Sequence, residues 1–224
     1  MDSISDQLRD LILSGQLAPG TKLLQIDLSE RLGVSRTPLR ESLRVLERDG
    51  LIQTANGNRT VEVVDPDPVD LLELYQIRQV LDGLAAALCA EQGLSAAQAR
   101  KLNSLARKME GLSMPEGANS YIKAHAEFHT QLFEASSNTR LQDMGAVFVN
   151  MSSQKSLVRF VAAHEPERME ELEASMDELV GADDTDHREL LDAIAEGRAR
   201  VAEAIARRHI ERNISLVQAF MPPG

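Results

Sequence analysis

Residues 32–50, LGVSRTPLRESLRVLERDG, constrain the fold most, because they predict one short helix with both ends marked. Thr37 can cap this helix, Pro38 suits its first position, and Gly50 can close its C-terminus. Three leucines, spaced three and four residues apart, share one stripe: Leu39, Leu43 and Leu46. One side of the helix is therefore expected to anchor in a small core.

A row of arginines follows the neighbouring stripe of this helix: Arg36 at its beginning, then Arg40, Arg44 and Arg48. The rigid guanidinium fork matches phosphate oxygens and the O6/N7 edge of guanine. Just upstream, Leu28 and Leu32 mark a shorter helix, with Gly33 at the bend. The two helices predict a helix-turn-helix whose second helix can enter a DNA groove. The alternative is a solvated arginine face on an ordinary amphipathic helix.

The pattern then changes from helical to extended. Leu51 and Ile52 begin a short strand, residues 55–58 supply a turn, and residues 60–64 form a β-rich return strand. A hairpin directly after a recognition helix is a wing. Arg59 at its tip can reach phosphate or the minor groove, and the alternative is a merely solvated charge.

The segment GVSRTPLRESLRVLERDGLI resembles the recognition segment of the GntR family of bacterial transcription regulators. The segment ISDQLRDLILSGQLAPGTKL resembles the first helix and the Pro-Gly turn of the same family. The resemblance implies a winged helix-turn-helix domain over residues 1–64 that binds DNA. Its expected DNA contacts come from the recognition helix and the wing: Ser35, Arg36, Thr37, Arg40, Arg44, Gly57, Asn58 and Arg59.

Charge is distributed unevenly along the chain. The 224 residues carry a net charge of −11. Residues 1–64 hold 8 Lys+Arg against 9 Asp+Glu, a net of −1, which leaves −10 for the remainder. A DNA-reading surface must therefore cluster its positive groups, as the arginine row does, while the acidic remainder stays off the duplex.

Cys89 is the only cysteine, so the chain has no disulfide framework and nothing in it argues for secretion. Its position in the run LAAALCA favours a small buried residue over a nucleophile. The sequence shows no signal peptide and no apolar span long enough for a bilayer. We therefore expect a cytoplasmic protein with no membrane partner.

Residues 65–68, DPDP, predict an extended linker, since two prolines prevent the strand from running into the next helix. Residues 69–224 are the second expected domain, an all-α bundle of six or seven helices. Breaks between these helices are expected near residues 93–95, 114–117, 136–138, 164–166, 181–184 and 197. The expected fold is therefore mainly α, with a winged helix-turn-helix domain ahead of a helical bundle.

Four of the five histidines lie on apolar helix faces. His125 and His129 are four residues apart on one face of a helix expected over residues 121–135, and His187 and His209 share faces with aliphatic residues. A buried imidazole needs a partner, and a single one is usually a hydrogen-bonded core residue. A shared divalent ion would satisfy several at once.

The segments YIKAHAEFHTQLFEASSN, DHRELLDAIAEG and ARRHI resemble the C-terminal ligand-binding domain of the FadR-like branch of GntR regulators. Many members bind a metal there through one aspartate and three histidines. The resemblance implies His129, His187 and His209 as ligands, with His125 standing where the family usually has the aspartate. Four imidazoles favour zinc, with nickel or cobalt as alternatives, at one ion per chain. Without the aspartate, the ion's charge should stay uncompensated and pull more strongly on an anion.

Arg78 lies among leucines and alanines on a helix expected over residues 69–90, so its guanidinium should point into the core. A buried arginine must be paired. Its partner is either Asp82, one turn further on, or a ligand carboxylate held by two hydrogen bonds. The segment LYQIRQVLDGLAAALCA resembles a family helix with an arginine at this position, which favours the ligand. The resemblance also implies a homodimer, which fits a two-fold operator.

The sequence therefore predicts a transcription regulator, expected to be a repressor, whose affinity for operator DNA is controlled by a small carboxylate effector at the histidine-bound metal. One alternative is a regulator for which the metal ion itself is the signal. Another is a metal-dependent enzyme. Against an enzyme, the chain has no nucleophile motif, and Glu127 is expected to point away from the face of His125 and His129.

Overall fold

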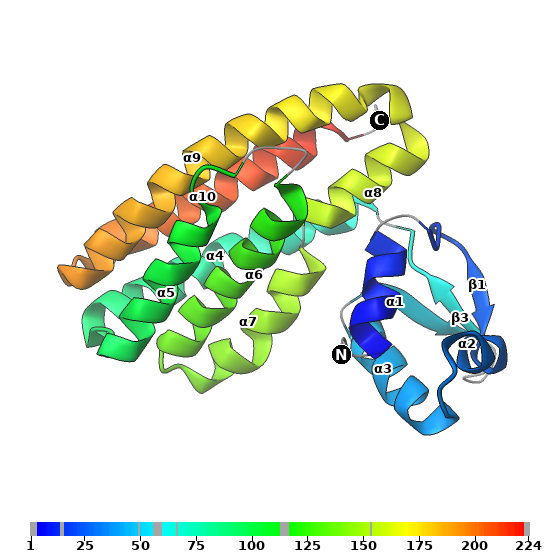
Figure 1. The fold of residues 1–224 in the computed structure, drawn as a ribbon. Helices are drawn as coiled ribbons and strands as arrows, with labels where there is room; N and C mark the ends of the chain where they lie inside the picture. Colours follow the sequence, from blue (N-terminus) through cyan, green and yellow to red (C-terminus); the bar gives the residue numbers. More distant parts are fainter. Residues whose placement is uncertain are drawn as a thin grey trace.

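The computed structural model describes residues 4–13, 16–48, 50–55, 60–65, 67–112, 117–152 and 154–221. The chain is mainly helical, as expected, and its buried apolar side chains form two separate clusters. The smaller cluster lies between Leu8 and Val63, and the larger one lies between Leu71 and Phe220. The N-terminal part, blue to cyan in Figure 1, lies beside one end of a larger helical bundle.

Three helices and a small antiparallel sheet make up the N-terminal part. Its elements are α1 (Ile4–Leu13), β1 (Lys22–Leu24), α2 (Gln25–Leu32), α3 (Arg36–Arg48), β2 (Ile52–Ala55) and β3 (Thr60–Val63). The expected hairpin strands β2 and β3 pair with each other, and β3 lies at the centre of the order β1-β3-β2. The sequence did not predict β1, which has three residues and pairs with β3 through Leu23 and Val61. The winged helix-turn-helix is confirmed.

The turn between α2 and α3 forms as expected at Gly33. This residue has φ of 65°, and the Gly33 and Val34 amides donate to the carbonyls of Glu30 and Ser29. Such a left-handed residue closes a helix at least cost when it is glycine. The chain can therefore turn directly from one motif helix into the next.

The beginning of α3 differs from the prediction. The helix starts at Arg36 rather than Pro38, and the Leu39 amide donates to the Ser35 carbonyl over 3.4 Å. Thr37 is thus inside the first turn and does not cap the helix. Pro38 is tolerated there, because the first-turn amides have no partner within the helix.

The C-terminal part is a bundle of helices. They are α4 (Pro68–Gln92), α5 (Ala96–Met109), α6 (Ala118–Ala135), α7 (Thr139–Met151), α8 (Gln154–His164), the 3-10 helix η1 (Pro166–Arg168), α9 (Met169–Ala195) and α10 (Ala199–Ala219). The side chains of Asp67, Ser95 and Asn138 cap α4, α5 and α7. In Figure 1, α9 and α10 run side by side, and α5, α6 and α7 are neighbours in a layer. Helix α4 packs against α6 to α10 and is the centre of the bundle.

Most of the expected helix breaks are confirmed, and one is wrong. Helix α9 continues through residues 181–184, because Asp183 is completely buried and makes contacts with other helices. A turn-like sequence is overridden here by tertiary contacts. A break between α7 and α8 at Ser152 was not predicted. The break expected at residues 114–117 lies mostly outside the described residues.

Helix α8 connects the bundle to the segment that follows the wing. Arg159 is buried on α8, and its Nη2 donates to the main-chain carbonyl of Val64 over 2.6 Å. His164 at the end of α8 lies 3.5 Å from the carboxylate of Asp65. The chain just after β3 is therefore held by two side chains of the bundle. None of the described helices combines the length and the apolar character needed to cross a bilayer.

Candidate metal centre

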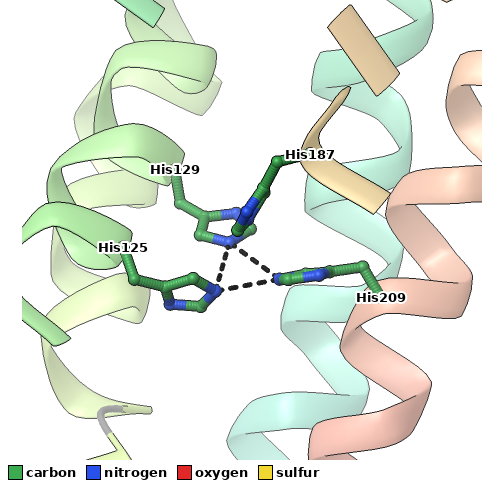
Figure 2. Close-up of side chains that lie close together, drawn as sticks. All are labelled: His125, His129, His187 and His209. Carbon is green, nitrogen blue, oxygen red and sulfur yellow. Dashed lines mark hydrogen bonds between the residues drawn. The ribbon is translucent and has the colours of Figure 1, made fainter. Parts of the chain in front are cut away.

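The four histidines singled out in the sequence lie together in the core of the bundle. His125 and His129 come from α6, His187 from α9 and His209 from α10 (Figure 2). All four side chains are buried, and each offers a ring nitrogen within 4.8 Å of the others. Residues separated by more than 80 positions in the chain thus form one cluster.

Three of the ring nitrogens lie close enough to bind one ion. The Nε2 atoms of His125 and His209 are 2.9 Å apart, those of His129 and His209 3.1 Å, and those of His125 and His129 3.2 Å. Imidazole nitrogens bind zinc at about 2.0–2.1 Å, so ligands roughly 90–100° apart around one ion would be separated by about 3 Å. The spacing of these three atoms fits a metal centre.

The outer nitrogens of two of these histidines contact carboxylates. Asp82 Oδ1 contacts His129 Nδ1, and Asp183 Oδ1 lies 3.0 Å from His209 Nδ1. The second pair does not have hydrogen-bond geometry, since neither Asp183 Oδ1 nor His209 Nδ1 has a hydrogen-bond partner among the described residues. In the tautomer with a proton on Nδ1, next to the carboxylate, the lone pair of each Nε2 points inward. Two lone pairs facing each other over 3.1 Å repel unless a cation lies between them. Carboxylate-anchored imidazoles of this kind are typical of metal ligands.

His187 closes the cluster from α9. Its ring lies 4.8 Å from that of His209 and 4.6 Å from that of Phe128, measured between centroids. Neither of its ring nitrogens has a hydrogen-bond partner among the residues that the structure describes. A histidine with only a packing role in the core would be hydrogen-bonded, so His187 fits the role of a metal ligand better.

The surroundings of His125, His129 and His187 favour the neutral imidazole, which is the form that binds a metal. Burial lowers the pKa of His125 and of His129 well below its usual range, and nearby positive groups lower both further. Burial also lowers the pKa of His187 to about 3. At neutral pH these rings offer lone pairs without first losing a proton.

The expectation of an ion without a compensating carboxylate did not take account of two side chains that lie beside the histidines. Two buried carboxylates, Asp82 on α4 and Asp183 on α9, contact the outer nitrogens of the histidines. Sequence reasoning missed Asp183 because it lies in the run read as a helix break. Its place four residues before His187 is the signal that could have found it, since residues four apart share a helix face.

Arg78 makes the first of the two pairings that the sequence left as alternatives. Its Nε donates to Asp82 Oδ2 over 3.2 Å, so the predicted pairing within α4 is present. Its Nη1 donates to the Ser152 hydroxyl over 3.2 Å. Its Nη2 is buried and has no hydrogen-bond partner among the described residues. Arg78 therefore pairs with Asp82 and still has one unsatisfied donor in the core.

Cys89 lies on α4 and is not one of the clustered side chains that could bind a metal. Its thiol donates weakly to the Leu132 carbonyl, and burial raises its pKa to about 12. A thiol with a raised pKa is a poor nucleophile. The expected packing role of Cys89 agrees with this environment.

The expected DNA contacts on the recognition helix all face solvent. Ser35, Arg36, Thr37, Arg40 and Arg44 are exposed, whereas the leucine stripe of α3 is buried in the N-terminal core. Arg44 forms an exposed ion pair with Glu41 over 2.8 Å. The expected wing contacts Gly57, Asn58 and Arg59 lie outside the described residues.

Known families match both parts of the chain. The family described as bacterial regulatory proteins, gntR family, matches residues 1–61, and the FCD domain matches residues 73–212. The chain belongs to the GntR family and has an FCD domain. It is therefore one of the bacterial DNA-binding transcription regulators, and the expectation that it is not an enzyme is confirmed by its family.

Named relatives support this assignment. The chain is 29% identical over 143 residues to the HTH-type transcriptional regulator YdhC of Bacillus subtilis, a match that spans 62% of each protein. It is 28% identical over 225 residues to an HTH-type transcriptional regulator of Streptomyces ambofaciens, covering 96% of this chain and 85% of the relative. The fold is similar to that of E. coli McbR/YncC, with a TM-score of 0.69, 21% identity and 98% and 99% of the two chains covered.

Proposed function

We propose that this GntR-family regulator binds operator DNA as a homodimer, and that a small carboxylate bound at a four-histidine metal centre controls that binding. We further propose that it acts as a repressor. The observation that carries the proposal is the convergence of three Nε2 atoms within 3.2 Å in a core that also contains an unsatisfied arginine donor. Residues 1–64 would form the DNA-binding domain, and residues 69–224 would form the domain that binds metal and effector. Residues 65–68 would link the two domains.

His125, His129, His187 and His209 would hold the ion, and imidazole ligands favour zinc, nickel or cobalt. The ion would supply a positive charge that attracts one end of an anionic ligand. The protein supplies the rest: two buried carboxylates beside the rings, and an apolar surround that excludes water.

Arg78 supports a carboxylate as the effector. Its Nη2 is a charged donor without a partner in the described structure, and such a group is costly to bury. A ligand carboxylate would satisfy this nitrogen by a charge-assisted hydrogen bond. Asp82 contacts both Arg78 and His129, so the arginine and the metal ligands are parts of one site.

A chain of contacts is available to carry the effector's influence to the DNA-binding part. Arg78 donates to Ser152 at the end of α7, and the following helix α8 carries Arg159, which holds the Val64 carbonyl at the end of the wing. A ligand that changes the position of Arg78 can thereby favour one arrangement of the two parts. Only a difference in affinity between the arrangements changes DNA binding.

The homodimer is supported by an apolar stripe on the outer face of α4. Val69, Ile77, Val80 and Leu84 recur at helical spacing, and each is more than 40% exposed. Large apolar side chains gathered on one exposed face commonly mark an interface. Ile77→Glu should therefore give monomers in size-exclusion chromatography with light scattering, and a dimeric Ile77→Glu would contradict this interface.

DNA binding measured with metal and acids added separately tests the effector proposal. DNA selected by the protein from a random pool would serve as operator in fluorescence anisotropy. If a carboxylate is the effector, the metal-loaded protein should change affinity only when a suitable acid is added. The second candidate is a metal-sensing regulator, which the burial of all four histidine side chains favours. It predicts that metal alone changes affinity, and that outcome would contradict a carboxylate signal.

A further inference from the structure

Asp183 occupies a position in the core for which the sequence pattern of the histidine site gives no role. It lies on α9 one turn before His187, and its side chain is completely buried. Its Oδ1 is 3.0 Å from His209 Nδ1, and its Oδ2 accepts a hydrogen bond from the Tyr121 hydroxyl over 2.8 Å. A buried carboxyl group thus lies beside the cluster, bound by a hydroxyl from α6 and adjacent to a histidine from α10.

The same carboxylate also lies near His125. Asp183 Oδ2 lies 3.7 Å from His125 Nε2, one of the three converging nitrogens. His125 is the ring that stands where the resemblance implies an aspartate ligand. Asp183 therefore lies next to the position at which this chain lacks a negative charge.

The neighbouring carboxylate of Asp186 is not available for this role. It is buried, but Arg208 Nη2 binds its Oδ1 at 2.5 Å, and Arg212 binds its Oδ2. Its nearer oxygen is 4.0 Å from His209 Nδ1. Two guanidinium groups already balance its charge, whereas among the described residues no guanidinium or ammonium group forms an ion pair with Asp183.

We propose that Asp183 is a positioning residue of the metal centre, which holds His209 in its binding orientation and supplies the negative charge that His125 cannot supply. This rests on the proposed metal site. The charge balances part of the ion's charge inside a dry core, where an unbalanced charge is costly. The site would therefore retain its ion when no carboxylate effector is bound, whereas four imidazole rings without a nearby carboxylate would retain it less well.

The test is zinc affinity measured by titration against a competing chelator, with Asp183→Asn compared with the full-length parent. Loss of an outer partner of a metal-binding histidine typically weakens metal binding by about 10- to 100-fold. The matched control is Asp184→Asn, which removes the same charge one residue away, where the carboxylate accepts from the Gly111 amide instead. Cobalt absorption bands should change in the Asp183 variant and not in the control.

A second variant keeps the test decisive if Asp183→Asn does not fold. Tyr121→Phe removes only the hydroxyl that orients Asp183, and it should weaken zinc binding by a smaller factor. Zinc affinity equal to the parent in a folded Asp183→Asn, or in Tyr121→Phe when the first variant is unfolded, would overturn the proposal. A parent that binds no metal would instead refute the proposed metal site itself, so the two failures are distinguishable.

Discussion

Arg78 and His129 contact opposite oxygens of one buried carboxylate, that of Asp82. The proposed effector contact and a proposed metal ligand are therefore mechanically connected. Any movement of Asp82 changes the position of both side chains. The affinities for metal and for effector should for this reason depend on each other, and each ligand should change the affinity for the other by the same factor.

Replacement of Arg78 by lysine should distinguish its ion pair with Asp82 from its proposed contact with the effector. The lysine keeps a positive charge beside Asp82, but a single ammonium cannot copy the guanidinium fork. We expect a melting temperature close to the parent's, unchanged metal content, and effector affinity about 10- to 150-fold lower, which corresponds to about 1.5–3 kcal/mol. Isothermal titration beside a melting curve measures both. Effector binding as tight as the parent's in a folded Arg78→Lys would exclude this contact.

Replacement of Arg40 by alanine should weaken DNA binding. If Arg40 contacts a base, the loss should be about 1–3 kcal/mol and depend on sequence. If it contacts phosphate, selected and random DNA should weaken alike and the salt dependence should decrease. Arg140→Ala is the control, because this exposed arginine pairs with Asp143 on α7, outside the motif. Equal effects of the two substitutions in fluorescence anisotropy would contradict the assigned face.

Removal of a histidine should remove the metal. Purified without a tag or chelator, the protein is expected to hold about one zinc, nickel or cobalt ion per chain. His129→Ala and His209→Ala should abolish it and lower the melting temperature, since a ligand of the folded form stabilises that form. His164→Ala, at the end of α8 and outside the cluster, should leave the metal content unchanged. The metal content is measured by inductively coupled plasma mass spectrometry. One metal ion per chain in both His129→Ala and His209→Ala would mean that the histidines only fill the core.

The metal-free protein should lose stability in mild acid. His125, His129 and His187 have a folded-state pKa below the unfolded value of about 6.5. The unfolded chain then binds more protons, so their contribution is complete above about pH 6.5 and is lost as the pH falls toward the folded values. Each should remove about 1.4 kcal/mol per pH unit. Urea unfolding in chelator at pH 7, 6 and 5 measures this, and a constant free energy would contradict neutral buried rings.

Replacement of Arg159 by alanine should weaken the coupling between the two parts of the chain. The variant should bind metal and effector like the parent, because Arg159 donates to Val64 and not to the histidine cluster. The effector-induced change in DNA affinity should become smaller. Arg198→Ala, at the turn before α10, is the control. An unchanged effector response in DNA-binding titrations of Arg159→Ala would show that the coupling takes another route.

Features that depend on local spacing could be predicted from the sequence. The helices of the motif, the hairpin and the helix faces of His125, His129, His187 and His209 follow from periodicities of two and 3.6 residues. The histidine cluster could be expected because four imidazoles that face the core of one helical bundle can be satisfied together by a shared ion. Arg78 could be located in the core for the same reason.

Features that depend on tertiary contacts could not be predicted from the sequence. Asp183 lies in the run GADD, whose composition indicates a turn, and only its contacts with Tyr121 and His209 explain why α9 continues. The pairing of Arg159 with a main-chain carbonyl leaves no pattern in the sequence, because every residue has such a carbonyl. The hydrogen bond between Arg78 and Ser152 could not be predicted either, since a serine near a helix end is common and Arg78 is 74 residues away.

The acceptor of Arg159 is a main-chain oxygen, so this contact makes no demand on the side chain of Val64. The wing and its recognition helix can then diverge in sequence, and with them the DNA that is read, without loss of the connection to α8. A hybrid protein that joins the N-terminal part of another GntR regulator to this bundle just after β3 should keep the contact. In such a hybrid, the ligand of this chain is expected to change the affinity for the other regulator's operator.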